Sequence, residues 1–136
     1  MSTSPINFLH FGYHGIDLSS NFFEGLIPLI PSNVTSLLLS KNTFLEKISF
    51  VCEIIGLCLS YLDLSNDWLP GQLPNYTMYW QKLIILNLAN NNFSIKLPSN
   101  IDSDCTVRSL GLYNDNFSRE WLSFLKNCKQ LPVLSL

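Results

Sequence analysis

The residues of this chain that could support catalysis or metal binding are few and are poorly spaced for it. His10 and His14 share one helical face, but no third ligand stands near them, so they do not predict a metal site. Asp17 and Asp63 occupy equivalent positions of a repeated pattern, yet Leu38 lies between them and argues against a catalytic pair. The chain has no glycine-rich phosphate loop and no nucleophile elbow. We therefore expect no enzyme activity, no cofactor and no metal.

The four cysteines, Cys52, Cys58, Cys105 and Cys128, contain no Cys-x-x-Cys pair, so their spacing does not favour zinc. Cys105 and Cys128 are nearly one period of the repeated pattern apart and could meet on neighbouring turns. Two buried thiols and a disulfide both fit this spacing, and buried thiols are the commoner outcome. A disulfide between Cys105 and Cys128 therefore stays possible.

Four triplets match the acceptor pattern for N-glycosylation, which is a modification of secreted and cell-surface proteins. They begin at Asn33, Asn75, Asn92 and Asn116. A chain rich in Asn and Ser produces some such triplets by chance. We expect at least two of the four to carry glycans.

Other features bound the class of protein. The first seven residues lack the positive start and apolar run of a signal peptide, and the most apolar window, residues 48–62, contains Glu53 and is too short to span a bilayer. We reconcile these absences with the glycosylation triplets by expecting a fragment of a longer protein. A net charge of −2 with 13% charged residues favours neither nucleic acid nor an anionic membrane as partner.

A repeated phrase organises all of these residues. Residues 86–93 read Leu-Asn-Leu-Ala-Asn-Asn-Asn-Phe, and the same arrangement of leucine, asparagine and a large apolar residue recurs at intervals of 21 to 25 residues. The copies begin their leucine pairs at Ile16, Leu37, Leu62, Leu86, Leu110 and Leu134. A fixed period of this size indicates a leucine-rich repeat solenoid. We expect a single domain over 1–136, with repeats starting near 13, 34, 59, 83, 107 and 131, the last truncated and no capping domains.

Each repeat is predicted to open with a short strand that pairs in parallel with its neighbours, so that its two leucines point inward and the residues between them face a concave surface. The residue before each inward pair, the one within it and the one after it form three outward columns, the third being Ser19, Ser40, Ser65, Ala89 and Tyr113. Bulky or charged side chains on this face are the candidate ligand contacts, because a rigid extended sheet presents them together. They are Leu38, Lys41, Tyr61, Asp63, Ile85, Arg108 and Tyr113.

Two further columns are predicted to be structural. Where the chain leaves the strand, a buried asparagine can satisfy free backbone groups of two repeats at once, whereas an ionised aspartate accepts but cannot donate. This ladder consists of Asn21, Asn42, Asp67, Asn91 and Asp115, and we expect local loosening at its two aspartates. Two residues further on, an apolar packing column follows: Phe23, Phe44, Leu69, Phe93 and Phe117.

The second halves of the repeats carry a resemblance to a known family. Residues 24–28 read Glu-Gly-Leu-Ile-Pro, residues 69–74 Leu-Pro-Gly-Gln-Leu-Pro, and residues 93–98 Phe-Ser-Ile-Lys-Leu-Pro. With Leu-Ser-Tyr-Leu-Asp-Leu-Ser-Asn at 59–66 and Leu-Lys-Asn-Cys at 125–128, they resemble the plant-type leucine-rich repeat of receptor-like protein ectodomains.

The resemblance implies an α/β solenoid: a right-handed horseshoe with a parallel concave sheet, a second short strand in each repeat, and 3₁₀ or short helices on the convex side, over five to six repeats. Residues 42–47 and 118–126 lack the glycine and proline of the pattern, which puts the second strand in doubt there. Apolar residues at helical spacing, Trp121, Leu122, Phe124 and Leu125, predict a short helix instead.

By the same resemblance, the chain is expected to be a non-catalytic ligand-binding part of a cell-surface receptor-like protein in plant defence or development. Its partners would be a peptide, glycan or protein ligand and a co-receptor kinase, at the extracellular face of the plasma membrane. One alternative is a secreted inhibitor of cell-wall-degrading enzymes, which would need a signal and capping motifs but no transmembrane helix. Another is a truncated gene product without independent function.

Overall fold

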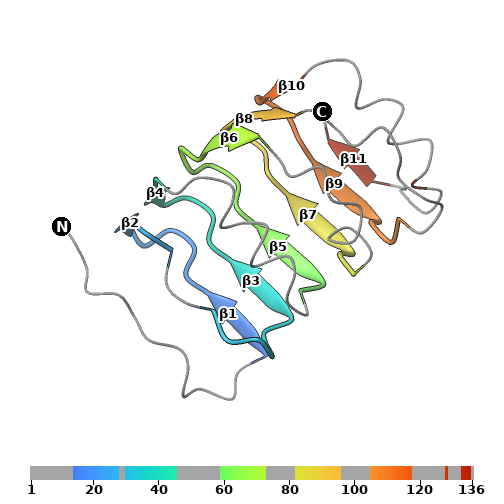
Figure 1. Cartoon of the computed structure of the whole chain (residues 1–136), viewed down its shortest axis with the longest axis horizontal. Helices are drawn as coiled ribbons and strands as arrows, with labels where there is room; N and C mark the ends of the chain where they lie inside the picture. Colours follow the sequence, from blue (N-terminus) through green and yellow to red (C-terminus); the bar gives the residue numbers. More distant parts are fainter. Residues whose placement is uncertain are drawn as a thin grey trace.

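A computed structural model of the chain describes residues 14–27, 30–45, 59–72, 82–95, 105–117, 128 and 133–135. Its largest element is a parallel sheet of six strands, which lie side by side in chain order (Figure 1). The strands are β1 (Gly15–Asp17), β3 (Ser36–Leu38), β5 (Tyr61–Asp63), β7 (Ile85–Asn87), β9 (Ser109–Gly111) and β11 (Val133–Ser135).

The register of this sheet follows the repeated phrase. Ile16 pairs with Leu37, and the pairing continues through the first leucine of each copy to Leu134. Side chains alternate as predicted. In β1, β3, β5, β7 and β9 the central residue is buried while its two neighbours are more exposed. Burial of each leucine contributes roughly 1.5–3 kcal/mol. This stacking of parallel strands is compatible with the predicted leucine-rich repeat solenoid.

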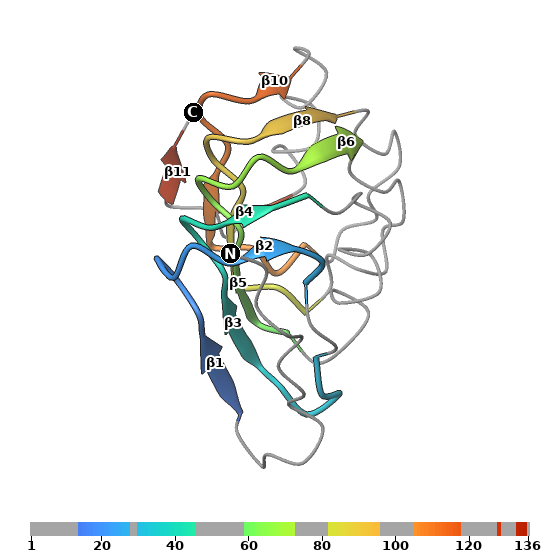
Figure 2. The ribbon, with the colours of Figure 1, turned by 90° about the vertical axis from the view of Figure 1, so that its left-hand side faces the viewer.

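A second tier of short strands stands apart from the six-stranded sheet (Figure 2). It contains a two-stranded and a three-stranded parallel sheet, in the orders β2-β4 and β10-β8-β6. The strands are β2 (Glu24–Gly25), β4 (Thr43–Phe44), β6 (Pro70–Gln72), β8 (Asn92–Ile95) and β10 (Asn116–Phe117).

The second strand, which the missing glycine and proline put in doubt in two repeats, is present in both as β4 and β10. Parallel pairing needs only backbone groups, and an apolar anchor holds the strand in place. In β4 that anchor is Phe44, which is buried and stacks on Phe23 with ring centroids 6.4 Å apart. The backbone N–H and the hydroxyl of Thr43 both donate to the Phe23 carbonyl, at 2.9 and 3.0 Å.

The second tier is offset by two residues from one repeat to the next. In the repeated phrase Trp68 corresponds to Asn92, but the structure pairs Asn92 with Pro70. Phe22 likewise corresponds to Thr43, which pairs with Glu24. Consecutive repeats are therefore displaced along the strand direction in this tier, while the six-stranded sheet keeps its leucines in line.

Three of the five residues of the third predicted outward column do not face the solvent. Ser40, Ser65 and Ala89 are buried, because the chain turns away from the sheet at this point. The turn is made by the next residue of each repeat, which has φ between 56° and 59° at Ser20, Lys41, Asn66, Asn90 and Asn114. Asparagine adopts this left-handed conformation more readily than most residues. Tyr113 alone in this column has a side chain exposed at 36%.

Some predictions fall on residues that the structure does not describe. The expected helix at 121–125, the convex segments and Asn75 are among them, as are the side chains of Asn116 and Phe117. Within the described ranges, no helix has the length and apolar character to cross a membrane.

Candidate ligand-binding surface

Three of the predicted contact residues lie together on the concave sheet. Tyr61, Ile85 and Tyr113 line a shallow pocket of about 260 Å³ across β5, β7 and β9. The remaining lining comes from the same strands: Asn87, Ser109, Leu110 and Gly111. Two tyrosines and an isoleucine around a polar floor provide apolar contact area and hydrogen-bonding groups without a charge. The pocket suits an uncharged or weakly charged group.

The other predicted contacts lie elsewhere. Leu38 and Asp63 are register partners in β3 and β5, and both are half-buried. The Asp63 carboxylate is engaged locally, since Oδ1 accepts from the backbone N–H of Ser65 at 2.9 Å and from its hydroxyl at 2.7 Å. Lys41 and Arg108 are exposed, but Lys41 follows its strand and Arg108 precedes its own. The structure therefore does not bring these two cations together.

Gly111 makes the floor of the pocket possible. A Cβ atom at this position would lie 2.5 Å from Asn87 Oδ1, so a larger residue fits only if the Asn87 amide moves away. Asn87 is held there because its Oδ1 accepts from the backbone N–H of Ala89 at 3.2 Å. The absence of a side chain at Gly111 in β9 leaves room for the Asn87 amide of β7.

Replacing Gly111 with alanine is expected to displace the Asn87 amide and lower the free energy of unfolding by about 1 kcal/mol, the net value of one hydrogen bond. Gly15 is the matched control, because the nearest atom to a Cβ there is 3.9 Å away. Gly15→Ala should be neutral or slightly stabilising. Urea denaturation of the two variants checks the difference, and equal effects would refute the close-contact explanation.

The asparagine ladder is best seen at Asn42, which satisfies backbone groups of two repeats. Its Oδ1 accepts from the N–H groups of Asn21 and Phe23 at 3.1 and 3.0 Å. Its Nδ2 donates to the carbonyls of Leu39 at 2.8 Å and Leu18 at 3.0 Å. Asn91 repeats this arrangement, with Nδ2 donating to Leu64 and Leu88 and Oδ1 accepting from Leu69.

Aspartate cannot complete the same set of bonds. Asp67 Oδ1 accepts from the N–H of Asn42 at 3.0 Å, and Asp115 Oδ1 accepts from Asn91 and Phe93. The second carboxylate oxygen of each is buried without a hydrogen-bond partner. Burial raises the pKa of Asp67 to about 7, with a smaller contribution from the Asp63 charge, and raises the pKa of Asp115 to about 6. Local loosening at these positions stays a prediction.

A disulfide joins Cys105 and Cys128, whose Cα atoms are 4.9 Å apart. Both residues are buried against the apolar core. The bond links the segment that enters β9 to the segment between β9 and β11. Of the two arrangements that the spacing left open, the structure contains the disulfide.

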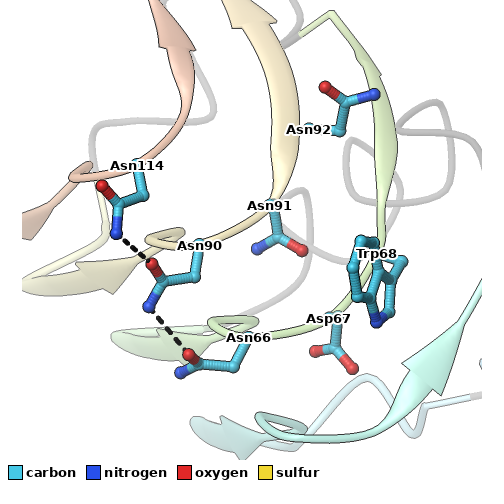
Figure 3. A pocket seen from close by; sticks show the side chains of 7 residues that line it. All are labelled: Asn66, Asp67, Trp68, Asn90, Asn91, Asn92 and Asn114. Carbon is cyan, nitrogen blue, oxygen red and sulfur yellow. Dashed lines mark hydrogen bonds between the residues drawn. The ribbon is translucent and has the colours of Figure 1, made fainter.

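A second row of amides lies along the edge of the sheet formed by the C-terminal ends of β5, β7 and β9, and it was not predicted from the sequence. Asn90 Nδ2 donates to Asn66 Oδ1 and Asn114 Nδ2 donates to Asn90 Oδ1, both at 2.7 Å. We call Asn66, Asn90 and Asn114 the edge amide row. The row lines one side of an open pocket of about 620 Å³ that also contains Asp67, Trp68, Asn91 and Asn92 (Figure 3). The available signal was an asparagine directly before three successive ladder positions.

Sequence comparison relates the chain to known plant proteins. No family model matches the chain. It is 33% identical to Receptor-like protein 13 of Arabidopsis thaliana over 129 residues, which are 90% of this chain and 12% of that protein. The chain resembles a segment of plant receptor-like proteins. It is also 42% identical to Receptor-like protein EIX2 of Solanum lycopersicum over 76 residues, 55% of this chain and 7% of that protein. It therefore spans only about a tenth of the length of these receptor-like proteins.

The structure describes the acceptor side chains of two glycosylation triplets, and their surroundings differ. Asn33 and Asn92 are both exposed. Asn33 lies in a turn, and its carbonyl is 3.3 Å from His14 Nδ1. His10 lies outside the described residues, and within them no three His, Cys, Asp or Glu side chains are grouped to hold a metal.

Proposed function

We propose that the chain is a non-catalytic ligand-binding segment of a plant cell-surface receptor-like protein. The concave pocket between Tyr61, Ile85 and Tyr113 is the observation that carries this proposal. Two of these residues, Tyr61 and Ile85, lie in strands that are bonded to both neighbours, so their side chains are held without ordering a loop. A preorganised surface loses little conformational entropy on binding.

The ligand class that fits this pocket best is an extended peptide. The tyrosines offer ring faces and hydroxyls, and the half-buried Asn87 presents an amide between them. Tyrosine is also enriched among residues that dominate binding energy. The intact protein would face the extracellular side of the plasma membrane and pair with a co-receptor kinase, in defence or developmental signalling.

Panning a random peptide library displayed on phage against the full chain tests the proposal. Peptides selected on the wild type should bind at least tenfold more weakly to Tyr61→Ala and Tyr113→Ala, the loss of about 1.4 kcal/mol per aromatic contact. Phe22→Ala is the control, because Phe22 is an exposed aromatic side chain outside this pocket. Equal loss in all three variants, or recovery of no peptide, would contradict a peptide-binding concave face.

A further inference from the structure

Trp68 is the largest side chain left open to solvent beside the edge amide row. It is 73% exposed, although an exposed indole leaves much apolar surface in contact with water. The concave pocket does not include it. It instead lines the 620 Å³ pocket, together with the exposed side chain of Asn92. An explanation for the open indole should therefore come from this second pocket.

Asn92 is the acceptor of a glycosylation triplet, Asn92-Phe93-Ser94, and its position relative to Trp68 is set by the repeat. The two residues fill the same place in successive repeats. Asn92 pairs with Pro70, and Trp68 stands two residues before Pro70 on the adjacent chain segment. Paired strands lie about 4.8 Å apart and rise about 3.3 Å per residue, so the Cα atom of a residue two positions back along the adjacent segment lies about 8 Å away, within reach of an indole side chain. In Figure 3 Asn92 and Trp68 lie on the side of the pocket opposite the edge amide row.

We propose that Asn92 carries an N-linked glycan whose first sugars pack on Trp68 and occupy this pocket. The glycan is attached when the Asn92 amide nitrogen bonds to C1 of a polyprenyl-diphosphate-linked oligosaccharide, loses a proton and releases the polyprenyl diphosphate. A transferase of the secretory pathway performs this step. The proposal does not depend on ligand binding at the concave face.

The lining of the pocket matches the chemistry of a neutral sugar. One face of a pyranose ring carries C–H groups and packs on an indole, while hydroxyl and acetamido groups project from its rim. The edge amide row can hydrogen-bond those rim groups. Each amide nitrogen carries two hydrogens. Asn90 and Asn114 each donate one of these hydrogens to the next amide of the row. The ionisable member of the lining is Asp67, which is buried beneath the pocket surface.

The other exposed triplet provides a contrast. Asn33 is exposed as well, but it belongs to neither the 620 Å³ pocket nor the concave pocket. A glycan on Asn33 has no comparable indole to cover in the described part of the chain. Asn33 is therefore the matched control for a glycan that only projects into solvent.

The test is a double-mutant cycle on the full chain, secreted behind a host signal peptide from cells that make high-mannose glycans. Mass spectrometry of glycopeptides first measures occupancy at Asn92. The glycosylated wild type should then melt about 3 °C higher than Asn92→Gln, a shift that corresponds to one aromatic packing contact. Trp68→Ala should remove this difference, and Trp68→Phe should restore part of it.

Combining Asn33→Gln with Trp68→Ala should give simply additive changes in melting temperature. Nuclear Overhauser contacts between the first sugar and the indole protons of Trp68 provide a readout that does not depend on stability. An unoccupied Asn92 would overturn the proposal. So would an occupied Asn92 whose effect is additive with that of Trp68→Ala and which shows no sugar–indole contact.

Discussion

Replacing Asp67 with asparagine is expected to raise the free energy of unfolding by about 1–3 kcal/mol at pH 8, the cost of a buried polar atom left without a partner. Asp67 is 2% exposed, and its Oδ2 has no hydrogen-bond partner. An amide at this position can donate as Asn42 and Asn91 do, to the carbonyl three residues earlier and to the equivalent carbonyl of the preceding repeat.

The gain should shrink as the pH falls. Burial raises the pKa of Asp67 from its usual 3.8 to about 7, so the folded protein binds a proton more tightly than the unfolded chain. This proton contributes stability that is fully present below pH 3.8 and is lost as the pH rises through 7. The variant loses that dependence, so denaturation curves of both proteins from below pH 3.8 to above pH 7 measure how their difference in unfolding free energy narrows as the pH falls.

The reciprocal variant, Asn42→Asp, serves as the control and should destabilise the protein increasingly as the pH rises. Asp115→Asn should show a weaker effect that changes between pH 3.8 and about pH 6, because the pKa of Asp115 is raised from 3.8 to about 6 and its Oδ1 already accepts from two N–H groups. A benefit of Asp67→Asn that is the same at every pH would show that protonation of this carboxyl is not involved.

Removing the disulfide should produce a loss of comparable size. The bond between Cys105 and Cys128 closes a loop with a sequence separation of 23 residues. Replacing both cysteines with serine is expected to lower the free energy of unfolding by roughly 3 kcal/mol, since a cross-link of this span restricts the unfolded chain. Guanidinium denaturation of the oxidised wild type and of the double variant measures the loss.

Reductant separates the disulfide from the other effects of the serine substitutions. A thiol reductant should weaken the wild type towards the double variant and leave the double variant unchanged. If reduced and oxidised wild type unfold at the same denaturant concentration, the cross-link contributes nothing to stability.

The strand register was predictable because the burial of leucine side chains outweighs every other contribution to it. Moving one strand by one residue would expose Leu62 or Leu86 and bury Tyr61 or Ile85, which would forfeit the burial energy of the whole strand. The spacing of the leucine phrase therefore predicted both the buried leucines and the meeting of Tyr61 and Ile85 on the concave face.

The arrangement of residues beyond the C-terminal ends of the strands was not predictable by the same reasoning. Alternation along a strand placed Ser65 and Ala89 outward, but alternation ends where the next residue turns into the left-handed region. That turn buries the serine and alanine and aligns Asn66 with Asn90. The joint position of Trp68 and Asn92 depends further on the two-residue offset of the second tier, which the repeated phrase does not predict.

The order of the six-stranded sheet has a mechanical consequence. Because β1 and β11 lie at opposite edges and every intervening strand bonds only to its two neighbours, a force applied across the sheet loads five interfaces in series. Hydrogen bonds between strands run along this direction, so the weakest interface yields first while the others stay closed. The molecule would extend one repeat at a time, and the Cys105–Cys128 link limits how far the last repeat can separate.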